Sequence, residues 1–204
     1  MQKIILISIF VFFSLKLFSQ KTIYLKNDSV IWSSGAKIKF AANYYVELNA
    51  DNEVVLGVLA EDSYLWTNQR LIKFKALNQI VFNENGKVIK GYLASVTPLS
   101  TINGYLDFAR NTDVTFNEYG KVISGSPENN YSYKLENKII EFEEKTRISF
   151  NEKGEVIEGI LAKREQLKTS TGKIKAFKGG TKIIFNQNKE VISEKQKNKK
   201  QNIE

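Results

Sequence analysis

The stretch Phe82-Asn83-Glu84-Asn85-Gly86-Lys87-Val88-Ile89-Lys90-Gly91-Tyr92-Leu93 decides the fold, because variants of it recur along most of the chain. The copies open at Leu48, Phe82, Phe116, Phe150 and Phe185, spaced 34, 34, 34 and 35 residues apart, and Asn follows each of these residues. A second aromatic column keeps the same spacing at Phe40, Phe74, Phe108, Phe142 and Phe177. A fixed period of this length is typical of repeat proteins. The chain of 204 residues therefore holds about five copies of one 34-residue unit.

Each unit is predicted to form short strands joined by tight turns. The spacing of the large apolar residues has a period of two, so Ile72 and Phe74, like Ile80 and Phe82, are expected on one face of a strand. Asn83 opens a turn, and Gly86 supplies the positive φ that a hairpin with a G1 bulge requires. Lys189 replaces this glycine in the last copy, so we expect the last hairpin to fray. In the second unit we expect strands near residues 63–66, 71–75, 79–83 and 87–94.

A glycine in the returning strand of the unit also recurs. It stands at Gly57, Gly91, Gly125 and Gly159. A strand position without a side chain leaves room for a neighbouring aromatic ring, so we expect a Phe to lie across it.

The fold class predicted from these features is all-β. One 34-residue unit cannot bury its own apolar face, so neighbouring units must pack on each other. We expect an elongated, twisted antiparallel β-meander of about five units. A small β-propeller or a β-solenoid is the alternative, although propeller blades usually take about 40–45 residues.

The two ends of the chain differ from the repeat array. Residues 1–20 resemble a signal peptide, with Lys3 before the apolar run from Ile4 to Leu15, which is too short for a comfortable membrane span. An uncleaved N-terminal anchor is the alternative. The array is assigned to residues 21–192, and residues 193–204 are predicted to be a disordered, Lys-rich tail. The expected location is exported: periplasmic, outer-surface or secreted, in a Gram-negative bacterium.

Two absences restrict the chemistry. The chain contains no Cys and no His, which excludes disulfides, thiol nucleophiles and histidine-based catalysis or metal binding. Glu84, Glu118 and Glu152 recur beside the turns and are interpreted as solvated turn residues rather than as catalytic carboxylates. We therefore expect no catalytic residue, cofactor or metal ion.

Two sets of residues are candidates for surface contacts. The first is aromatic, because exposed Trp and Tyr side chains stack on sugars and on protein partners. It consists of Trp32, Trp66, Tyr64 and Tyr92. The second belongs to the tail and would contact an anionic surface: Lys195, Lys197, Lys199 and Lys200. The formal net charge of +8 favours an anionic envelope component, and nucleic acid is not expected for an exported protein.

The motif from Phe82 to Leu93 resembles the MORN-type hairpin and related repeats of bacterial exported proteins, which combine an aromatic residue, an Asn-Gly turn and a glycine in the returning strand. The match covers about half of each unit, and the period of 34 departs from standard MORN units. The resemblance implies a single-layer β-meander used for protein or membrane-surface contacts, without conserved chemistry.

The expected function is that of a non-enzymatic interaction or scaffold module in the cell envelope, bound to an unknown protein or anionic component. Repetition multiplies one surface, whereas catalysis needs a unique pocket. The alternative is a carbohydrate-binding or carbohydrate-active envelope protein that uses Trp, Tyr and carboxylates. A mainly structural spacer is a third reading, and no transmembrane span is expected in the mature chain.

Overall fold

The computed structural model describes residues 21–196, and every element within them is a β-strand or a turn. Eleven strands form one antiparallel sheet. Its order is β1 (Lys21–Tyr24), β4 (Tyr45–Leu48), β5 (Val54–Val58), β8 (Gln79–Phe82), β9 (Val88–Tyr92), β12 (Asp113–Phe116), β13 (Val122–Gly125), β16 (Ile148–Phe150), β17 (Val156–Ile160), β20 (Thr181–Phe185) and β21 (Val191–Gln196).

The remaining ten strands form five separate hairpins. They are β2 (Ser29–Ser33) with β3 (Ala36–Phe40), β6 (Ser63–Trp66) with β7 (Leu71–Phe74), β10 (Thr97–Thr101) with β11 (Gly104–Phe108), β14 (Tyr131–Leu135) with β15 (Lys138–Phe142), and β18 (Glu165–Lys168) with β19 (Ile174–Phe177).

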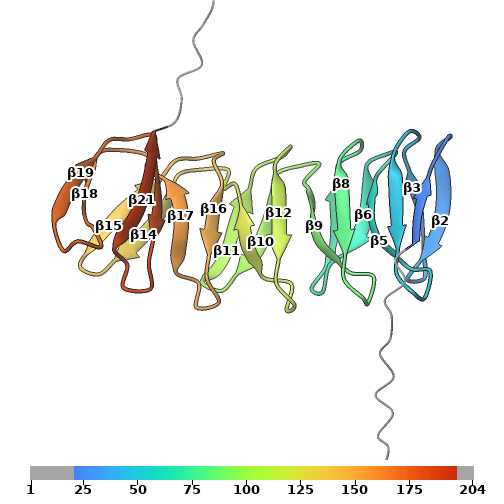
Figure 1. Cartoon of the computed structure of the whole chain (residues 1–204), viewed down its shortest axis with the longest axis horizontal. Helices are drawn as coiled ribbons and strands as arrows, with labels where there is room; N and C mark the ends of the chain where they lie inside the picture. The colour runs from blue at the N-terminus through green and yellow to red at the C-terminus, as the bar shows by residue number, and fades with distance from the viewer. Residues whose placement is uncertain (1–20, 197–204) are drawn as a thin grey trace, which may run out of the picture.

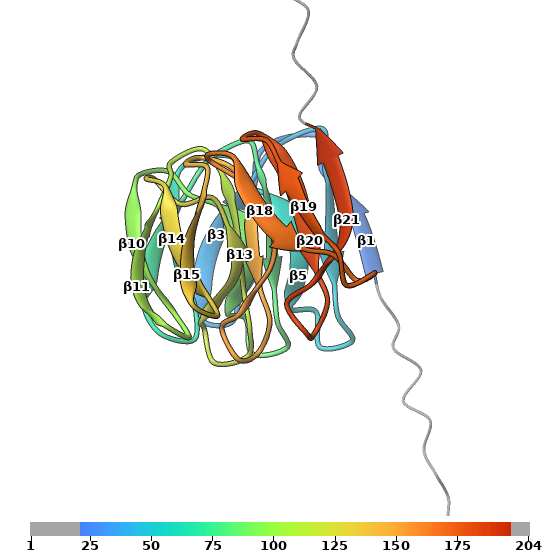
Figure 2. The same ribbon diagram turned by 90° about the vertical axis from the view of Figure 1, so that its left-hand side faces the viewer.

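The units follow one another along the long axis of the molecule (Figure 1). Each unit gives two strands to the sheet and one hairpin to a second layer, which lies on one side of the sheet (Figure 2). The predicted all-β repeat of four antiparallel strands per unit is confirmed. The sheet is open, with β1 and β21 at its two ends, and does not close into a propeller. The second layer differs from the single layer that the resemblance implied.

The core lies between the sheet and the hairpins. In the second unit the sheet contributes Ile80 and Phe82, and the hairpin contributes Leu65, Ile72 and Phe74, all of them buried. The residues between them point away from the core because side chains alternate along a strand. The equivalent positions of the other units are filled in the same way, so the core runs along the array.

The mid-strand glycines accommodate the buried Phe column as predicted. A Cβ atom placed at Gly91 would lie 2.5 Å from Cδ1 of Ile80 and 2.7 Å from Cδ1 of Phe74. The corresponding distance from Gly57 to the Phe40 ring is 2.6 Å. The hairpin layer therefore rests its Phe rings directly on the glycines of the sheet.

The recurrent Asn closes each turn at one edge of the sheet. The side-chain oxygen of Asn83 accepts hydrogen bonds from the backbone N–H groups of Asn85, at 3.0 Å, and Lys87, at 2.9 Å. Asn49, Asn117, Asn151 and Asn186 bond in the same way. This local network explains why Asn recurs in every copy, since an Asx turn satisfies two backbone donors at once.

The turn glycines have a second role, because the tips of the hairpins pack against them. A Cβ atom at Gly120 would lie 2.8 Å from the Gln69 side chain, and one at Gly154 would lie 2.7 Å from Asn103. Gln69 and Asn103 also donate hydrogen bonds to the carbonyl groups of Tyr119, at 3.0 Å, and Gly154, at 2.7 Å. Hairpins and sheet turns are thus joined at their ends as well as through the core.

Two sequence predictions about the C-terminal end are wrong. The last hairpin does not fray: Lys189 adopts a φ of 62°, and β20 pairs with β21 from Thr181 to Phe185. The Asx turn of Asn186 supplies the local hydrogen bonds that offset the unfavourable φ of Lys189. The array also continues beyond residue 192, because Ser193–Gln196 belong to β21; the rest of the predicted tail, residues 197–204, lies outside the described residues.

Candidate functional site

The outward-facing residues of the five hairpins form the hairpin face, which consists of four rows that run across the units. The strands that enter the hairpins contribute the rows Val30, Tyr64, Pro98, Ser132 and Gln166, and Trp32, Trp66, Ser100, Lys134 and Lys168. Ser100 is the buried member of its row, because the Lys121 side chain covers it and donates a 2.8 Å hydrogen bond to its hydroxyl. The strands that leave contribute Lys37, Leu71, Tyr105, Ile139 and Ile174, and Lys39, Lys73, Asp107, Glu141 and Ala176. Members of a row are separated by two sheet strands, or about 9.6 Å.

Three of the four predicted aromatic contact residues lie together on the hairpin face. Trp32 is 63% exposed, Tyr64 64% and Trp66 55%, on the first two hairpins. Each ring has a Lys ammonium near it: the Nζ atom lies 5.4 Å from the Trp32 centroid for Lys37 and 5.9 Å from the Tyr64 centroid for Lys73. Lys87 stands 5.9 Å from the Trp66 ring. This arrangement presents flat rings and positive charges to a partner.

Tyr92, the fourth predicted residue, does not join this group. It follows Gly91 in β9, and Gly91 faces the hairpins, so Tyr92 points to the opposite face of the sheet. There it is half-buried and pairs across the strands with Asp113.

A second exposed row was missed in the sequence. Leu71, Tyr105, Ile139 and Ile174 are 40%, 77%, 65% and 73% exposed, and they occupy equivalent places on four successive hairpins. Exposed apolar side chains gathered in one place mark interaction surfaces. The sequence contains a periodic signal for this row, because its members are spaced 34, 34 and 35 residues apart, in register with the buried Phe column.

Asp28 and Asp62, which stand four residues before Trp32 and Trp66, bind the backbone. The Oδ1 atoms of Asp28 and Asp62 each accept a 2.9 Å hydrogen bond, from the N–H groups of Ala42 and Ala76. Asn130 does the same for Glu144 at 2.9 Å. These side chains tie the entry and exit loops of their hairpins together, so their recurrence has a structural explanation.

The basic tail falls largely outside the described residues. Lys195 is exposed in β21 and lies opposite Lys182 of β20. Lys197, Lys199 and Lys200 lie outside residues 21–196, so the predicted cluster stays a prediction.

The carboxylates with a clear pKa shift are held by structural contacts. The Ser33 hydroxyl donates a 2.7 Å hydrogen bond to Oε2 of Glu53, which lowers the pKa of that carboxyl. Lys168 lies 2.8 Å from Glu190 and lowers its pKa by donating a hydrogen bond. A general acid of a glycosidase needs the opposite shift, toward a higher pKa. Glu84, Glu118 and Glu152 are exposed turn residues, as predicted.

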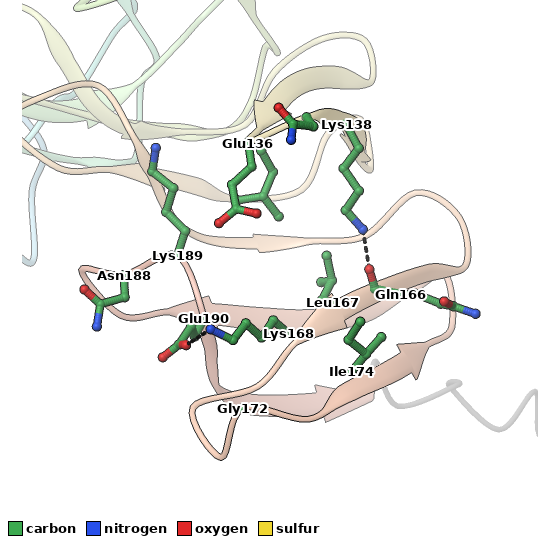
Figure 3. A pocket seen from close by; sticks show the side chains of 12 residues that line it. Glu136, Lys138, Gln166, Leu167, Lys168, Gly172, Ile174, Asn188, Lys189 and Glu190 are labelled. Atoms are coloured by element: carbon green, nitrogen blue, oxygen red, sulfur yellow. Dashed lines mark hydrogen bonds and ion pairs between the residues drawn. The ribbon is translucent and has the colours of Figure 1, made fainter.

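A cavity of about 570 Å³ opens between the last two hairpins and the turn from β20 to β21 (Figure 3). Lys189 stands here at the position that the turn glycines hold in other units, and its Nζ pairs with Glu155 at 3.0 Å. The cavity is lined by charged side chains, namely Glu136, Glu190, Lys138, Lys168 and Lys189. The apolar part of its wall is formed by Leu135, Leu167 and Ile174. The residues that line it include no aromatic side chain on which a sugar would stack.

Within residues 21–196, no cluster of three or more potential metal-ligating side chains is placed to hold an ion. The same part of the chain contains no helix long and apolar enough to cross a membrane. No protein-family model matches the chain, and its sequence has no significant match among the curated proteins.

Proposed function

We propose that the protein is a non-enzymatic interaction or scaffold module of the cell envelope, and that it binds its partner through the hairpin face. The observation that carries this proposal is the gathering of exposed Trp32, Tyr64, Trp66 and Tyr105 on one side of a rigid two-layer array. Large aromatic side chains dominate binding energy when a partner covers them. The opposite face of the sheet exposes the rings of Tyr24 and Tyr45 at its first edge, and the residues near Tyr92 on that face are half-buried.

The repeat architecture supports a binding role over a catalytic one. Equivalent residues recur at each hairpin, which builds an extended surface rather than one asymmetric site. The apolar segment of residues 1–20 supports export to the envelope, and the Phe-Asn-Gly pattern supports a MORN-like class.

A carbohydrate-binding role is the second candidate, favoured by the two indole rings that stand at equivalent positions of adjacent hairpins. Trp32 and Trp66 are separated by one repeat, about 9.6 Å, and both are more than half exposed. Flat rings at a regular spacing suit successive sugars of an extended glycan.

The test is capture of partners from envelope extract, run beside binding to soluble polysaccharides. The Trp32→Ala/Trp66→Ala variant is compared with Tyr45→Ala, which removes a ring that is 60% exposed on the sheet. We expect the Trp variant to lose at least tenfold in binding, because hot-spot aromatics contribute about 2 kcal/mol or more. Equal binding by the two variants would overturn the proposal, and binding to polysaccharide alone would select the second candidate.

A further inference from the structure

The charges on the hairpin face change sign along the array. The row at the base of the hairpins reads Lys39, Lys73, Asp107 and Glu141, so it is basic in the first two units and acidic in the next two. The row nearer the tips changes from Trp32 and Trp66 to Lys134 and Lys168. Reversal of the order of the hairpins would place the basic half of the base row against its acidic half, and Trp32 and Trp66 against Ile174 and Ile139, while Lys37 and Lys168 would meet at the two ends.

We propose that two copies of this chain dock through their hairpin faces, about a two-fold axis that passes through the third hairpin, β10–β11, parallel to its strands. This proposal rests on the proposed function and names the partner of the hairpin face. Rotation about this axis leaves the position of each row along the strand direction unchanged. It reverses the order of the hairpins along the array. The second hairpin of each copy then faces the fourth hairpin of the other, with β6 against β15 and β7 against β14. A symmetric contact of this kind is the commonest way in which identical chains associate.

The side chains that meet in this arrangement are complementary. Trp66, which is 55% exposed, lies against Ile139 of the second copy, which is 65% exposed. Leu71 lies against Lys134, whose ammonium then reaches the Trp66 ring. Lys73 and Glu141 stand at the same level on neighbouring strands of the two faces, within reach of each other's long side chains. Tyr105, the most exposed of these residues at 77%, lies beside its own copy at the axis.

The charged groups are free to exchange their present partners. Lys73 is 3.6 Å from Asp62, and Glu141 is 3.2 Å from Lys163, in ion pairs on the surface. Such pairs contribute about 0–1 kcal/mol, so their loss costs little. The size of the face is also adequate: five hairpins about 9.6 Å apart, with strands about 15 Å long, cover on the order of 700 Å² in projection. A standard interface takes about 800 Å² from each partner.

Other occupants fit the face less well. A uniformly anionic membrane or polysaccharide would attract Lys37, Lys39, Lys73, Lys134 and Lys168, but it would leave Asp107 and Glu141 facing like charges. The aliphatic side chains of Leu71, Ile139 and Ile174 lack the flat ring that stacks on sugars. A second copy brings Lys73 close to Glu141 and covers the apolar row, and the like charges of Lys37 and Lys168 meet only at the two ends of the interface.

The first test measures the oligomeric state of the protein, expressed from the full chain, by sedimentation equilibrium. We expect a dimer that Lys73→Glu and Glu141→Lys each weaken about tenfold or more, since each substitution sets like charges against each other at two symmetric places. The Lys73→Glu/Glu141→Lys variant should recover to within about threefold of the wild type. Thermal unfolding of each variant separates a weakened contact from a loss of folding. Single variants that associate like the wild type would overturn the arrangement.

Two further variants test the position of the axis. Asp107 lies beside its own copy there, so Asp107→Asn should tighten the dimer several-fold by removing a like-charge contact. The chain has no Cys, so Tyr105→Cys provides a single thiol for a short bismaleimide. The two layers lie about 10 Å apart, beyond the reach of a disulfide but within that of the linker. Tyr45→Cys, on the opposite face, is the matched control.

The outcomes separate this inference from the proposed function. Efficient cross-linking at residue 105 but not at residue 45, with rescue by the charge exchange, supports the dimer. A monomer at all concentrations overturns the inference, and the proposed function survives if Trp32 and Trp66 still govern capture of an envelope partner. A monomer that also binds polysaccharide, vesicles and extract proteins regardless of those two residues overturns both.

Discussion

At Gly91 the lack of a side chain lets β9 lie directly beneath the Phe74 ring. The Gly91→Val substitution would force its side chain against Phe74 and Ile80, both of which are fully buried. We expect a loss of about 1–3 kcal/mol in the free energy of unfolding through overpacking, measured by urea denaturation. Gly35→Ala is a useful comparison, because no atom lies near its added methyl group and only the strain of a φ of 78° acts. Wild-type stability of Gly91→Val would contradict the packing of the hairpin layer on the glycines.

Glu53 gives the first turn a dependence on pH. The hydrogen bonds from Ser33 and Ser34 lower the pKa of Glu53 in the folded state, so the unfolded chain binds the proton more readily. The stabilisation is therefore complete above the unfolded pKa and is lost as the pH falls through the folded pKa. We expect Glu53→Gln to lower the unfolding midpoint at pH 7, and its difference from the wild type to shrink as the pH falls through the folded pKa of Glu53. Glu84→Gln, at an exposed turn, controls for the substitution itself, and a gap between Glu53→Gln and the wild type that stays constant with pH would contradict the role of Glu53.

At the scale of the element, the sequence predicts the positions of the strands better than the layer to which each strand belongs. The period of two and the Asn-Gly turns locate β6 to β9 within a few residues. Neither feature tells a hairpin strand from a sheet strand, since Phe74 and Phe82 both point into the core from strands of the same pattern. Which strands form the hairpin depends on the loops at its base. These loops are joined by contacts such as the hydrogen bond from the Ala76 N–H to Asp62.

The same difference explains the outcome for the candidate site. Alternation with Leu65 predicts that Tyr64 and Trp66 are exposed on one face. Tyr92 alternates equally well, but it belongs to the other layer, and a linear pattern does not show to which layer a strand belongs. Leu71, Tyr105, Ile139 and Ile174 keep the period of the repeat, but the sequence does not show that they are exposed, because that depends on which strands form the outer layer.

The hairpin loops allow a stabilising substitution to be designed from the repeats. Asp28, Asp62 and Asn130 accept hydrogen bonds from the backbone of the exit loop, whereas Val96 stands at this place in the third unit and its aliphatic side chain has no acceptor. Val96 is 43% exposed, so its replacement gives up little burial. We expect Val96→Asp to raise the free energy of unfolding by about 1 kcal/mol, as a net hydrogen bond does.

Asp62→Ala provides the reciprocal measurement for this loop. It removes the acceptor at 2.9 Å from the Ala76 N–H, so it should lower stability by a similar amount. Val96→Thr, similar in shape but with a shorter polar group, serves as the control for the substituted site. A decrease in stability for Val96→Asp would show that the loops of the third unit are tied together differently.

At the scale of the whole molecule, stability arises from contacts between neighbours. Each unit packs on the next through the sheet and through hairpin tips such as Gln69, which bonds to Tyr119. Arrays of this kind behave as one-dimensional chains of similar modules. The two open ends, β1 and β21, are the places where this chain of contacts stops.

Removal of one complete unit tests this description. Deletion of residues 83–116 joins Phe82 to Asn117 and so preserves the Phe-Asn step of the repeat. In the shortened chain, Gly154 takes the place that Gly120 has against the tip of the second hairpin. The shortened protein should unfold cooperatively, with a urea m-value lower by about a fifth, because m scales with the surface that unfolding exposes. Deletion of residues 83–115 removes one residue fewer and shifts the pattern by one position. Because such a shift turns every inward side chain of the following strand outward, this second protein should fail to fold. Equal behaviour of the two deletions, folded or unfolded, would show that the register between units does not determine the fold.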